Sequence, residues 1–558
     1  MPTRPLPRPP QIIILSDPYQ LDTVRYMGPY TIKNHLTRAG YDVVVIDYFT
    51  RFESDQEFFD YLANFVSDRL ISVMISTTFT YSSPTEAVGW ARSEVSSHVK
   101  SDQEQRTGWW EHVKASSLFL WKGTNGKLRH WMESLKSTLA DNHASHAKIV
   151  LGGERLNWIF KFNPEQIPED YALGLTDYCL LGKADNYVVD FVQGLETGKF
   201  GSINFSMTKK SGMTFLVPQG RQIYDRHRDE IPDSTFSVLD AVLPGEWLPF
   251  ENARGCAFNC SYCNYDKGYS QKKSIEQMRR EFMYNWETHG TTGYSFTGEC
   301  FNDDYAHVCD FLELVESLPF RLEWNGYARL DLSHKYPDLA NKVIDSGGRS
   351  LIFGIETLSR PAGSINGRGL KPQRVLELAE QYKKAGDKYG GVHLKACFIS
   401  GLPGETPESQ TKTNDWIRKQ TIFNSVLGNV LEVMPYEEDL ESVFNFSRIN
   451  LDPSKYGFRE LSFDPYYWRH DTMDVDQAVD LNWEFNEANR ANPYTFKYGN
   501  GKRNVNLYFY SAARSLGMSH PEAMQVFHSV TDLYPRFRKR IKKYHSRLLA
   551  LWTGKRDK

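Results

Sequence analysis

Short apolar runs separated by helical stretches dominate the first 195 residues and restrict the fold. They lie at 11–15, 41–49, 71–79, 147–154 and 177–185. Runs that are apolar throughout are typical of parallel strands buried on both faces, and a helical pattern at 30–39 ends at Gly40. The pattern predicts an α/β fold with a Rossmann-like, doubly wound sheet. No GxGxxG follows the first run, which disfavours a dinucleotide site.

A second series of apolar runs begins after residue 246. Its candidate strands are 247–252, 293–298, 321–328, 350–356, 392–400 and 429–435. One intervening stretch places Ile275, Met278, Phe282 and Trp286 on a single helical face, and another helix is expected over 371–384. Six βα units in series predict a partial (β/α)6 barrel, whose chemistry belongs at the carboxyl ends of its strands.

These patterns divide the chain into four expected parts. They are a Rossmann-like domain at 1–195 with an insertion at about 84–145, a connector at 196–246, the barrel at 247–440 and a mainly helical C-terminal region at 441–558. We expect the C-terminal region to shape the substrate site.

The C-terminal region ends in a basic amphipathic helix. Its apolar stripe consists of Phe537, Ile541, Tyr544, Leu548 and Trp552. One interpretation is that this stripe packs on the barrel while the lysines and arginines face solvent. The other is that the helix binds an anionic partner such as nucleic acid.

The composition of the 558-residue chain limits its surroundings. The formal net charge is −3, which indicates no overall attraction to nucleic acid or acidic membranes. No apolar run approaches the roughly 18 residues of a membrane span, and Ile12–Leu15 is too short for the core of a signal peptide. We therefore expect a cytoplasmic protein without membrane partners.

Three of the seven cysteines lie close together in a CxxxCxxC motif, at Cys256, Cys260 and Cys263. In a reducing compartment such clustering indicates metal or redox chemistry. A zinc site would need a fourth ligand at short spacing, yet the next candidates are His289 and Cys300. Three thiolates can instead hold three irons of a four-iron cluster and leave the fourth iron open to an exogenous ligand.

A CxxxCxxC motif after the first strand of a βα barrel resembles the radical S-adenosylmethionine (radical SAM) superfamily. The resemblance implies a four-iron four-sulfur cluster on the three cysteines and SAM as the ligand of the open iron. It also implies reductive cleavage of SAM to methionine and a 5′-deoxyadenosyl radical. The electron would come from an external donor such as flavodoxin or ferredoxin.

The resemblance extends to residues that follow the other barrel strands. Tyr262 matches the aromatic residue beside the adenine, Gly298 and Glu299 the stretch that meets the SAM amino group, and Arg329 the partner of the SAM carboxylate. Glu356 and the segment 400–405 match the ribose and adenine contacts, so the implied cofactor-binding residues also include Ser400 and Leu402. A purely structural ion pair is the alternative for Glu299, Arg329 and Glu356.

Three further residues near the second barrel strand have two interpretations each. Asp303 and Asp304 resemble an acidic stretch of one large subgroup, but acids at a helix start are also simply solvated. Cys300 directly follows Glu299 and is a candidate catalytic hydrogen donor to a substrate radical. Its alternative is a buried structural thiol.

That large subgroup carries an N-terminal cobalamin-binding domain, and the resemblance to it covers most of residues 10–435. Cobalamin is therefore an implied cofactor. The chain has no DxHxxG motif, and His35 lies inside a helical pattern, so either cobalamin binds without a histidine ligand or it is absent. Glu154 and Arg155 also replace a Pro-His-like pair of the family.

Two branches of the superfamily fit the sequence less well. The tRNA methylthiotransferases hold a second cluster on N-terminal cysteines, whereas the first cysteine here is Cys179. The SPASM-type peptide-maturing enzymes have a C-terminal cysteine cluster, which this chain also lacks.

The leading functional hypothesis is radical methylation, rearrangement or cyclisation at an unactivated carbon of a small-molecule substrate. The alternatives are a non-catalytic iron–sulfur or zinc protein, and a radical SAM enzyme that acts on nucleic acid through the basic helix.

Overall fold

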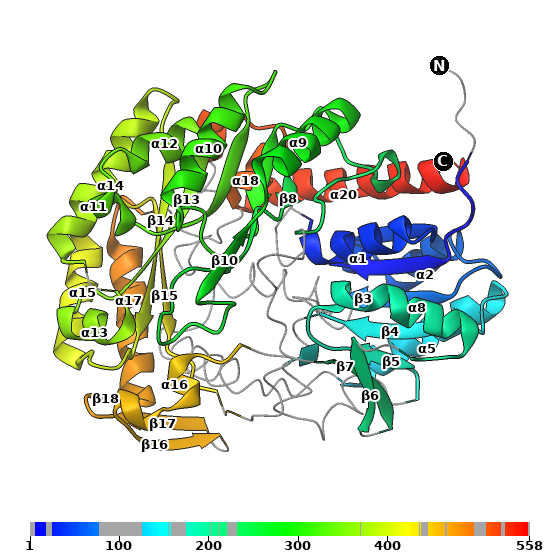
Figure 1. The fold of residues 1–558 in the computed structure, drawn as a ribbon, viewed down its shortest axis with the longest axis horizontal. Coiled ribbons are helices and arrows are strands. Elements are labelled where there is room, and N and C mark those ends of the chain that lie inside the picture. The colour runs from blue at the N-terminus through cyan, green and yellow to red at the C-terminus, as the bar shows by residue number, and fades with distance from the viewer. Residues whose placement is uncertain are drawn as a thin grey trace.

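The computed structural model contains two large sheets that lie next to each other, with helices covering both (Figure 1). The residues it describes are 6–17, 25–76, 125–153, 156–157, 174–201, 204–210, 212–219, 231–368, 370–434, 436, 445–463, 466–495, 509–525 and 530–555. Within these ranges no helix is long and apolar enough to cross a membrane.

The first sheet has seven strands in the order β2-β1-β3-β4-β5-β7-β6 and is parallel except for the β6–β7 pair. Its strands are β1 (Ile12–Ser16), β2 (Val43–Asp47), β3 (Ser72–Ser76), β4 (Lys148–Gly152), β5 (Tyr178–Leu180), β6 (Phe205–Lys210) and β7 (Met213–Pro218). The five strands expected from the sequence are present. The last two lie within the range expected to be a connector, because the polar sequence of β6 gives no apolar run.

Helices cover both faces of the first sheet, as a doubly wound sheet requires. Ile12 and Ile14 of β1 point towards α1 (Met27–Arg38) and α8 (Val188–Thr197). Ile13 and Leu15 point the other way, towards α2 (Asp55–Ala63) and α5 (Asn125–Asp141), which lies at the end of the expected insertion. This alternation explains why the strands are apolar throughout.

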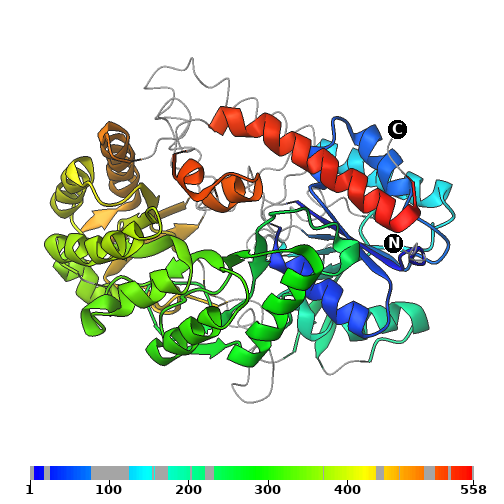
Figure 2. The same cartoon turned by 90° about the horizontal axis from the view of Figure 1, so that it is seen from above.

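The basic helix α20 (Val530–Thr553) packs on the first sheet and not on the barrel, which corrects one expectation from the sequence. All five residues of its apolar stripe are buried against the face that α2 and α5 cover. Figure 2 shows the helix, in red, beside the blue and cyan elements of that sheet. Amphipathic spacing identifies the apolar face of a helix but not the surface that it covers.

Helix α20 also protects the edge strand β2. The Tyr544 hydroxyl donates to the Val45 carbonyl at 3.2 Å and accepts from the Asp47 amide at 3.1 Å. His545 Nε2 lies 2.9 Å from the Asp47 carbonyl oxygen. These contacts satisfy backbone groups that an edge strand leaves open.

The second sheet has six parallel strands in the order β15-β14-β13-β12-β11-β8, which confirms the partial barrel. Its strands are β8 (Leu248–Phe250), β11 (Gly293–Phe296), β12 (Glu323–Ala328), β13 (Gly348–Glu356), β14 (His393–Ser400) and β15 (Ser425–Val430). The last strand begins four residues before the expected run at 429–435, because its first half mixes small, apolar and polar residues.

One helix follows each barrel strand and covers the outside of the sheet. The helices are α9 (Ile275–His289), α10 (Tyr305–Glu316), α12 (Leu339–Asp345), α14 (Pro372–Asp387), α15 (Pro407–Lys419) and α17 (Val475–Ala491). The sixth comes from the C-terminal region: the Phe485 ring of α17 packs 5.4 Å from Phe398 of β14. Part of the C-terminal region therefore completes the barrel.

The remaining elements are short. The C-terminal region adds an antiparallel sheet of β16 (Phe458–Phe463), β17 (Tyr466–His470) and β18 (Met473–Asp474), which the sequence did not predict. The short helices are α11 (Leu332–Lys335), α13 (Arg360–Asn366), α16 (Arg448–Leu451), α18 (Phe509–Ser515), α19 (His520–Gln525), η1 (Phe49–Arg51), η3 (Ala184–Asn186), η4 (Val238–Asp240) and η6 (Ser454–Tyr456).

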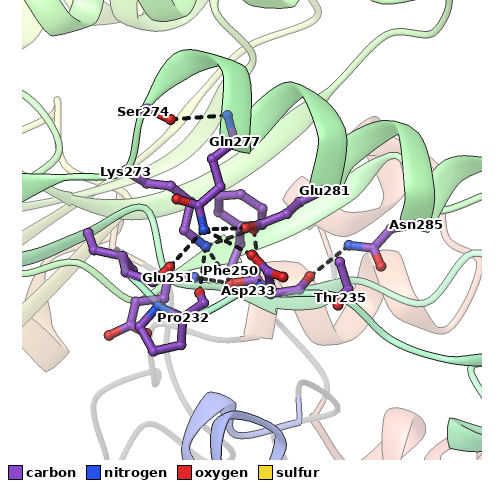
Figure 3. Close-up of polar contacts among 12 residues, drawn as sticks. Pro232, Asp233, Thr235, Phe250, Glu251, Lys273, Ser274, Gln277, Glu281 and Asn285 are labelled. Carbon is purple, nitrogen blue, oxygen red and sulfur yellow. Dashed lines mark hydrogen bonds and ion pairs between the residues drawn. The ribbon is translucent and has the colours of Figure 1, made fainter. Parts of the chain in front are cut away.

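A strap formed by residues 231–246 joins the two sheets and is bound on both sides. On the barrel side, Lys273 and Glu281 form a buried ion pair of 2.7 Å (Figure 3). The Lys273 ammonium also donates to the Pro232 carbonyl at 2.9 Å. On the other side, Lys33 of α1 forms a buried pair with Asp240. The strap thereby fixes α1 of the first sheet relative to α9 of the barrel.

Candidate active site

The three clustered cysteines lie on a hairpin at the mouth of the barrel. Strands β9 (Ala253–Cys256) and β10 (Tyr269–Lys272) pair antiparallel with Cys256 opposite Tyr269, and the loop between them carries Cys260 and Cys263. Gly255 has a φ of +77°, and a Cβ there would lie 2.6 Å from the Tyr269 carbonyl oxygen. The close pairing of the hairpin therefore requires glycine at this position.

Arg329, which follows β12, lies against the cysteine loop. Its Nη1 is 3.6 Å from the Cys260 sulfur, and its guanidinium carbon is 3.8 Å from the centre of the Phe258 ring. Its Nε donates to Asp331 Oδ1 at 2.9 Å, although burial opposes both charges. Asp331 was not singled out from the sequence, although it lies in the motif after β12.

Tyr262 and Glu356 meet through Arg368, which sequence reasoning missed. Arg368 Nε donates to the Tyr262 hydroxyl at 2.9 Å, and its Nη2 lies 3.8 Å from Glu356 Oε1. Burial raises the pKa of Glu356, and the nearby Arg368 partly counteracts it. Glu356 also has a φ of +67°, a conformation that costs a non-glycine residue free energy and occurs often at functional sites.

Gly298 and Glu299 follow β11 on the same side of the barrel. The Gly298 amide donates to Asn252 Oδ1 at 3.2 Å, and a Cβ at Gly298 would lie 2.8 Å from that oxygen. Glu299 Oε2 is buried without a hydrogen-bond partner among the described residues. Burial raises the pKa of Glu299 to about 7. An unpartnered carboxylate at a barrel mouth is suited to a cationic ligand.

Cys300 lies beside Cys256 and is almost fully buried. A hydrogen bond from Cys300 lowers the pKa of the Cys256 thiol to about 7. Asp303 accepts from the Ala257 amide at 3.0 Å and pairs with Lys272, so it supports the cysteine loop. Asp304 accepts from the His307 amide at 3.2 Å and caps α10, which is the structural alternative considered for it.

The side chains of Ser400 and Leu402 are buried in the interior. The Ser400 hydroxyl accepts from Asn482 of α17 at 3.2 Å, and Leu402 is buried in the core formed with the C-terminal region. Asn366 connects this turn to the cysteine loop, because it donates to the Pro403 carbonyl at 2.9 Å and accepts from Ser261. The segments after four barrel strands and the cysteine hairpin therefore converge on one side.

Residues 253–417, which span this site, match the family model of the radical SAM superfamily. This segment is a radical SAM domain. SAM and a four-iron four-sulfur cluster are the cofactors of this superfamily.

Two curated relatives are similar to parts of this radical SAM protein. An uncharacterised methyltransferase of Pyrococcus horikoshii is 22% identical over 293 residues, which are 51% of this chain and 60% of the relative. A tRNA-2-methylthio-N(6)-dimethylallyladenosine synthase of Petrotoga mobilis is 26% identical over 199 residues, which are 33% of this chain and 42% of the relative. The matched part thus spans about half the length of these relatives.

Two solved structures share the fold of this chain over most of its length. The methyltransferase TsrM from Kitasatospora setae, with tryptophan and a SAM analogue bound, gives a TM-score of 0.57 at 12% identity and covers 95% of this chain and 99% of its own. The cobalamin-dependent radical enzyme OxsB gives a TM-score of 0.50 at 12% identity, and the match covers 80% of this chain and 56% of OxsB. At such identity the likeness concerns the fold, and it confirms a Rossmann-like sheet followed by a radical SAM barrel.

The residues at the barrel mouth fit a cluster and SAM chemically. Within the described ranges, no three His, Cys, Asp or Glu side chains are grouped as ligands of a single metal ion. A four-iron cluster needs no such convergence, since each thiolate binds a different iron. The buried, unpartnered Glu299 oxygen suits an ammonium group, and Arg329 presents a guanidinium beside Cys260.

Proposed function

We propose that the protein is a radical SAM methyltransferase that acts on an unactivated carbon of a small molecule with the help of cobalamin. The observation that carries the proposal is the grouping of three free cysteines with Arg329 and Glu299 at the carboxyl ends of the barrel strands. The likeness to TsrM across nearly the whole chain supports the methyltransferase assignment.

In this proposal Cys256, Cys260 and Cys263 would hold the cluster, which would supply the electron for reductive cleavage of SAM. Glu299 binds the SAM ammonium group and Arg329 its carboxylate. Tyr262 lies along the adenine, and the backbone of 400–405 contacts the nucleoside. Asp331 and Arg368 position Arg329 and Tyr262 through the contacts described above.

Cobalamin would supply a methyl carrier at the carboxyl edge of the first sheet, where doubly wound sheets bind ligands. TsrM has been solved with cobalamin and a four-iron four-sulfur cluster bound, with a TM-score of 0.55. The segments after β1, β3 and β4, including Glu154 and Arg155, lie outside the described residues. His35 sits on α1, where burial lowers its pKa. It does not lie in a loop after a strand.

The substrate and the electron donor are further proposals. Tryptophan bound to TsrM supports a small molecule with a heteroaromatic ring as the substrate class. Flavodoxin or ferredoxin would supply the electron. Such chemistry requires a reducing compartment such as the cytoplasm, as the seven free thiols also do.

The proposed reaction is tested by anaerobic reconstitution with iron and sulfide, followed by reduction in the presence of SAM. We expect a brown protein that forms 5′-deoxyadenosine. Cys260→Ala should lose both properties, whereas Cys309→Ala, a half-buried thiol on α10, should keep them. Wild-type behaviour of Cys260→Ala, or zinc in place of iron in the purified protein, would rule the proposal out.

Cobalamin binding is tested separately with hydroxocobalamin. We expect the corrin absorption band to stay with the protein after desalting. A protein that cleaves SAM but releases all corrin would be a radical SAM enzyme of another type, which separates the two parts of the proposal.

A second candidate function is action on nucleic acid, favoured by the outer face of α20. Arg536, Lys539, Lys543 and Arg547 are exposed along one side of the helix, and within the described ranges none of them has an ion pair. The Petrotoga relative is named for a tRNA modification. Salt-sensitive retention of tRNA that Lys539→Glu/Lys543→Glu abolishes would support this candidate.

A further inference from the structure

A loop of the first sheet contacts the cysteine hairpin at the mouth of the barrel. The loop follows β5 and contains Lys183 and Asp185, with one residue between them. Asp185 Oδ2 lies 2.8 Å from Arg254 Nη1 on β9, and Lys183 forms an ion pair with Asp266, three residues after Cys263. Both ends of the cysteine hairpin are thus held by a loop that follows a strand of the other sheet.

The Lys183–Asp266 pair has a different environment from an ordinary surface pair. The Asp266 side chain is only 6% exposed, whereas that of Lys183 is 35% exposed. Asp266 also accepts from Asn445, which belongs to the C-terminal region. One buried carboxylate therefore joins the first sheet, the cysteine hairpin and the C-terminal region. A buried carboxylate that loses its cation is strongly destabilised, so Lys183 matters for the position of this loop.

The same pair lies close enough to Glu299 to affect its charge. Beyond the dominant effect of burial, Asp266 raises the pKa of Glu299, and Lys183 lowers it. Lys183 thus partly offsets the repulsion that Asp266 exerts on the Glu299 carboxylate.

We propose that Lys183 is a positioning residue for SAM binding, through which the first sheet takes part in the SAM site of the barrel. Its ammonium holds Asp266, which keeps the cysteine loop in place next to Glu299. The inference rests on the proposed function, because it assumes that Glu299 receives the SAM ammonium group. According to this inference, SAM binding depends on a residue next to the first sheet as well as on the residues of the barrel.

The test uses the reconstituted full-length protein and its variants Lys183→Met and Lys183→Arg. SAM is titrated while the electron paramagnetic resonance spectrum of the reduced cluster is recorded, and KM and kcat for 5′-deoxyadenosine formation are measured. We expect Lys183→Met to raise Kd and KM for SAM about tenfold with kcat within twofold of wild type, since the chemistry itself is untouched. Lys183→Arg, which keeps the cation, should stay within about threefold of wild type.

A double-mutant cycle with Asp266→Asn shows whether the two residues act through one contact. We expect Lys183→Met/Asp266→Asn to bind SAM no more weakly than either single variant, because residues in contact are not additive. Asp266→Asn also replaces Lys183→Met as the test if the latter does not take up iron. The matched control is Lys148→Met, whose pair with Asp177 lies on the same sheet at 3.7 Å.

The outcomes separate this inference from the proposed function. Lys183→Met with a SAM affinity within twofold of wild type would overturn the inference while leaving the proposed function intact. If the double variant lost SAM affinity by the sum of the two single effects, the inference would likewise be overturned. A wild-type protein whose cluster spectrum does not respond to SAM would overturn both.

Discussion

Arg329 Nη1 lies 3.6 Å from the sulfur of Cys260, while Nε of the same guanidinium donates to Asp331 at 2.9 Å. One cation thus contacts a proposed cluster ligand and a carboxylate from its own strand end. Asp331 fixes the plane of the guanidinium, so the remaining N–H groups are oriented before SAM arrives. Preorganised donors of this kind lower the cost of binding a carboxylate.

We predict that Arg329→Met weakens SAM binding at least tenfold without loss of iron. The variant removes the proposed partner of the SAM carboxylate and leaves Asp331 without its cation. Arg329→Lys should recover only part of the affinity, because an ammonium cannot hold Asp331 and a second carboxylate in one plane. Equilibrium titration with SAM measures the effect. Arg418→Met, which removes an exposed pair with Asp415, is the control and should bind SAM normally.

We predict that SAM affinity depends on pH through Glu299. Burial raises the pKa of Glu299 to about 7, above the usual value of a glutamate, so the proton is held more tightly in the folded protein. Binding of the SAM ammonium requires the ionised carboxylate. Affinity should therefore rise by up to about tenfold per pH unit between pH 5.5 and 6.5 and level off above the pKa.

The Glu299→Gln variant shows whether this carboxylate causes the pH dependence. We expect weaker binding and a flat affinity profile between pH 5.5 and 6.5. A variant that keeps the wild-type slope would assign the titration to another group and remove Glu299 from the proposed site.

The buried pair between Lys273 and Glu281 should matter for stability. Lys273→Met leaves Glu281 as an uncompensated buried charge, which costs about 3–5 kcal/mol. The expected result is a lower midpoint of thermal unfolding. Lys273→Met/Glu281→Met should recover much of this loss, because no buried charge remains. Lys412→Met, which breaks an exposed pair with Glu408, should leave the midpoint of thermal unfolding close to that of the wild type.

Tyr544→Phe should destabilise the first sheet. The hydroxyl bonds both the Val45 carbonyl and the Asp47 amide of β2, and its loss leaves these buried groups unpaired at a cost of about 1–3 kcal/mol. Amide hydrogen exchange at β2 should speed up, with less change in the barrel. Tyr284→Phe, at a position 42% exposed on α9, serves as the control. Unchanged exchange at β2 would mean that the hydroxyl does not protect this edge.

Much of the architecture could be predicted because both sheets are buried on two faces. The central strands of the first sheet are apolar almost throughout, as in Ile12–Leu15, and the barrel strands each contain a shorter apolar run such as Leu351–Phe353. The antiparallel strands β6, β7 and β16–β18 were not predicted. Two of them, β6 and β16, are mostly exposed or half-buried and contain no apolar run. The packing of α20 on the first sheet was not predicted either, because an apolar stripe does not identify the sheet that it covers.

The candidate site was predictable where the motif follows a strand directly. The cysteines, Glu299, Arg329 and Glu356 all lie at strand ends, and the topology brings such ends together. The sequence around Arg368 and around Lys183 contains no motif that would indicate a role in the site. Arg368 follows a short helix, and Lys183 belongs to the other sheet, so only the tertiary arrangement reveals their contacts with Tyr262 and Asp266.

The contact between Tyr544 and β2 joins residues 497 positions apart in the chain. On the ribosome, the strands of the first sheet emerge long before the helix that covers their edge. The nascent chain must therefore carry an uncovered strand edge and an apolar face through most of its synthesis. Folding of the first sheet can finish only after translation of residues 530–553, and chaperones that shield exposed edges should influence the yield of this protein more than its final stability.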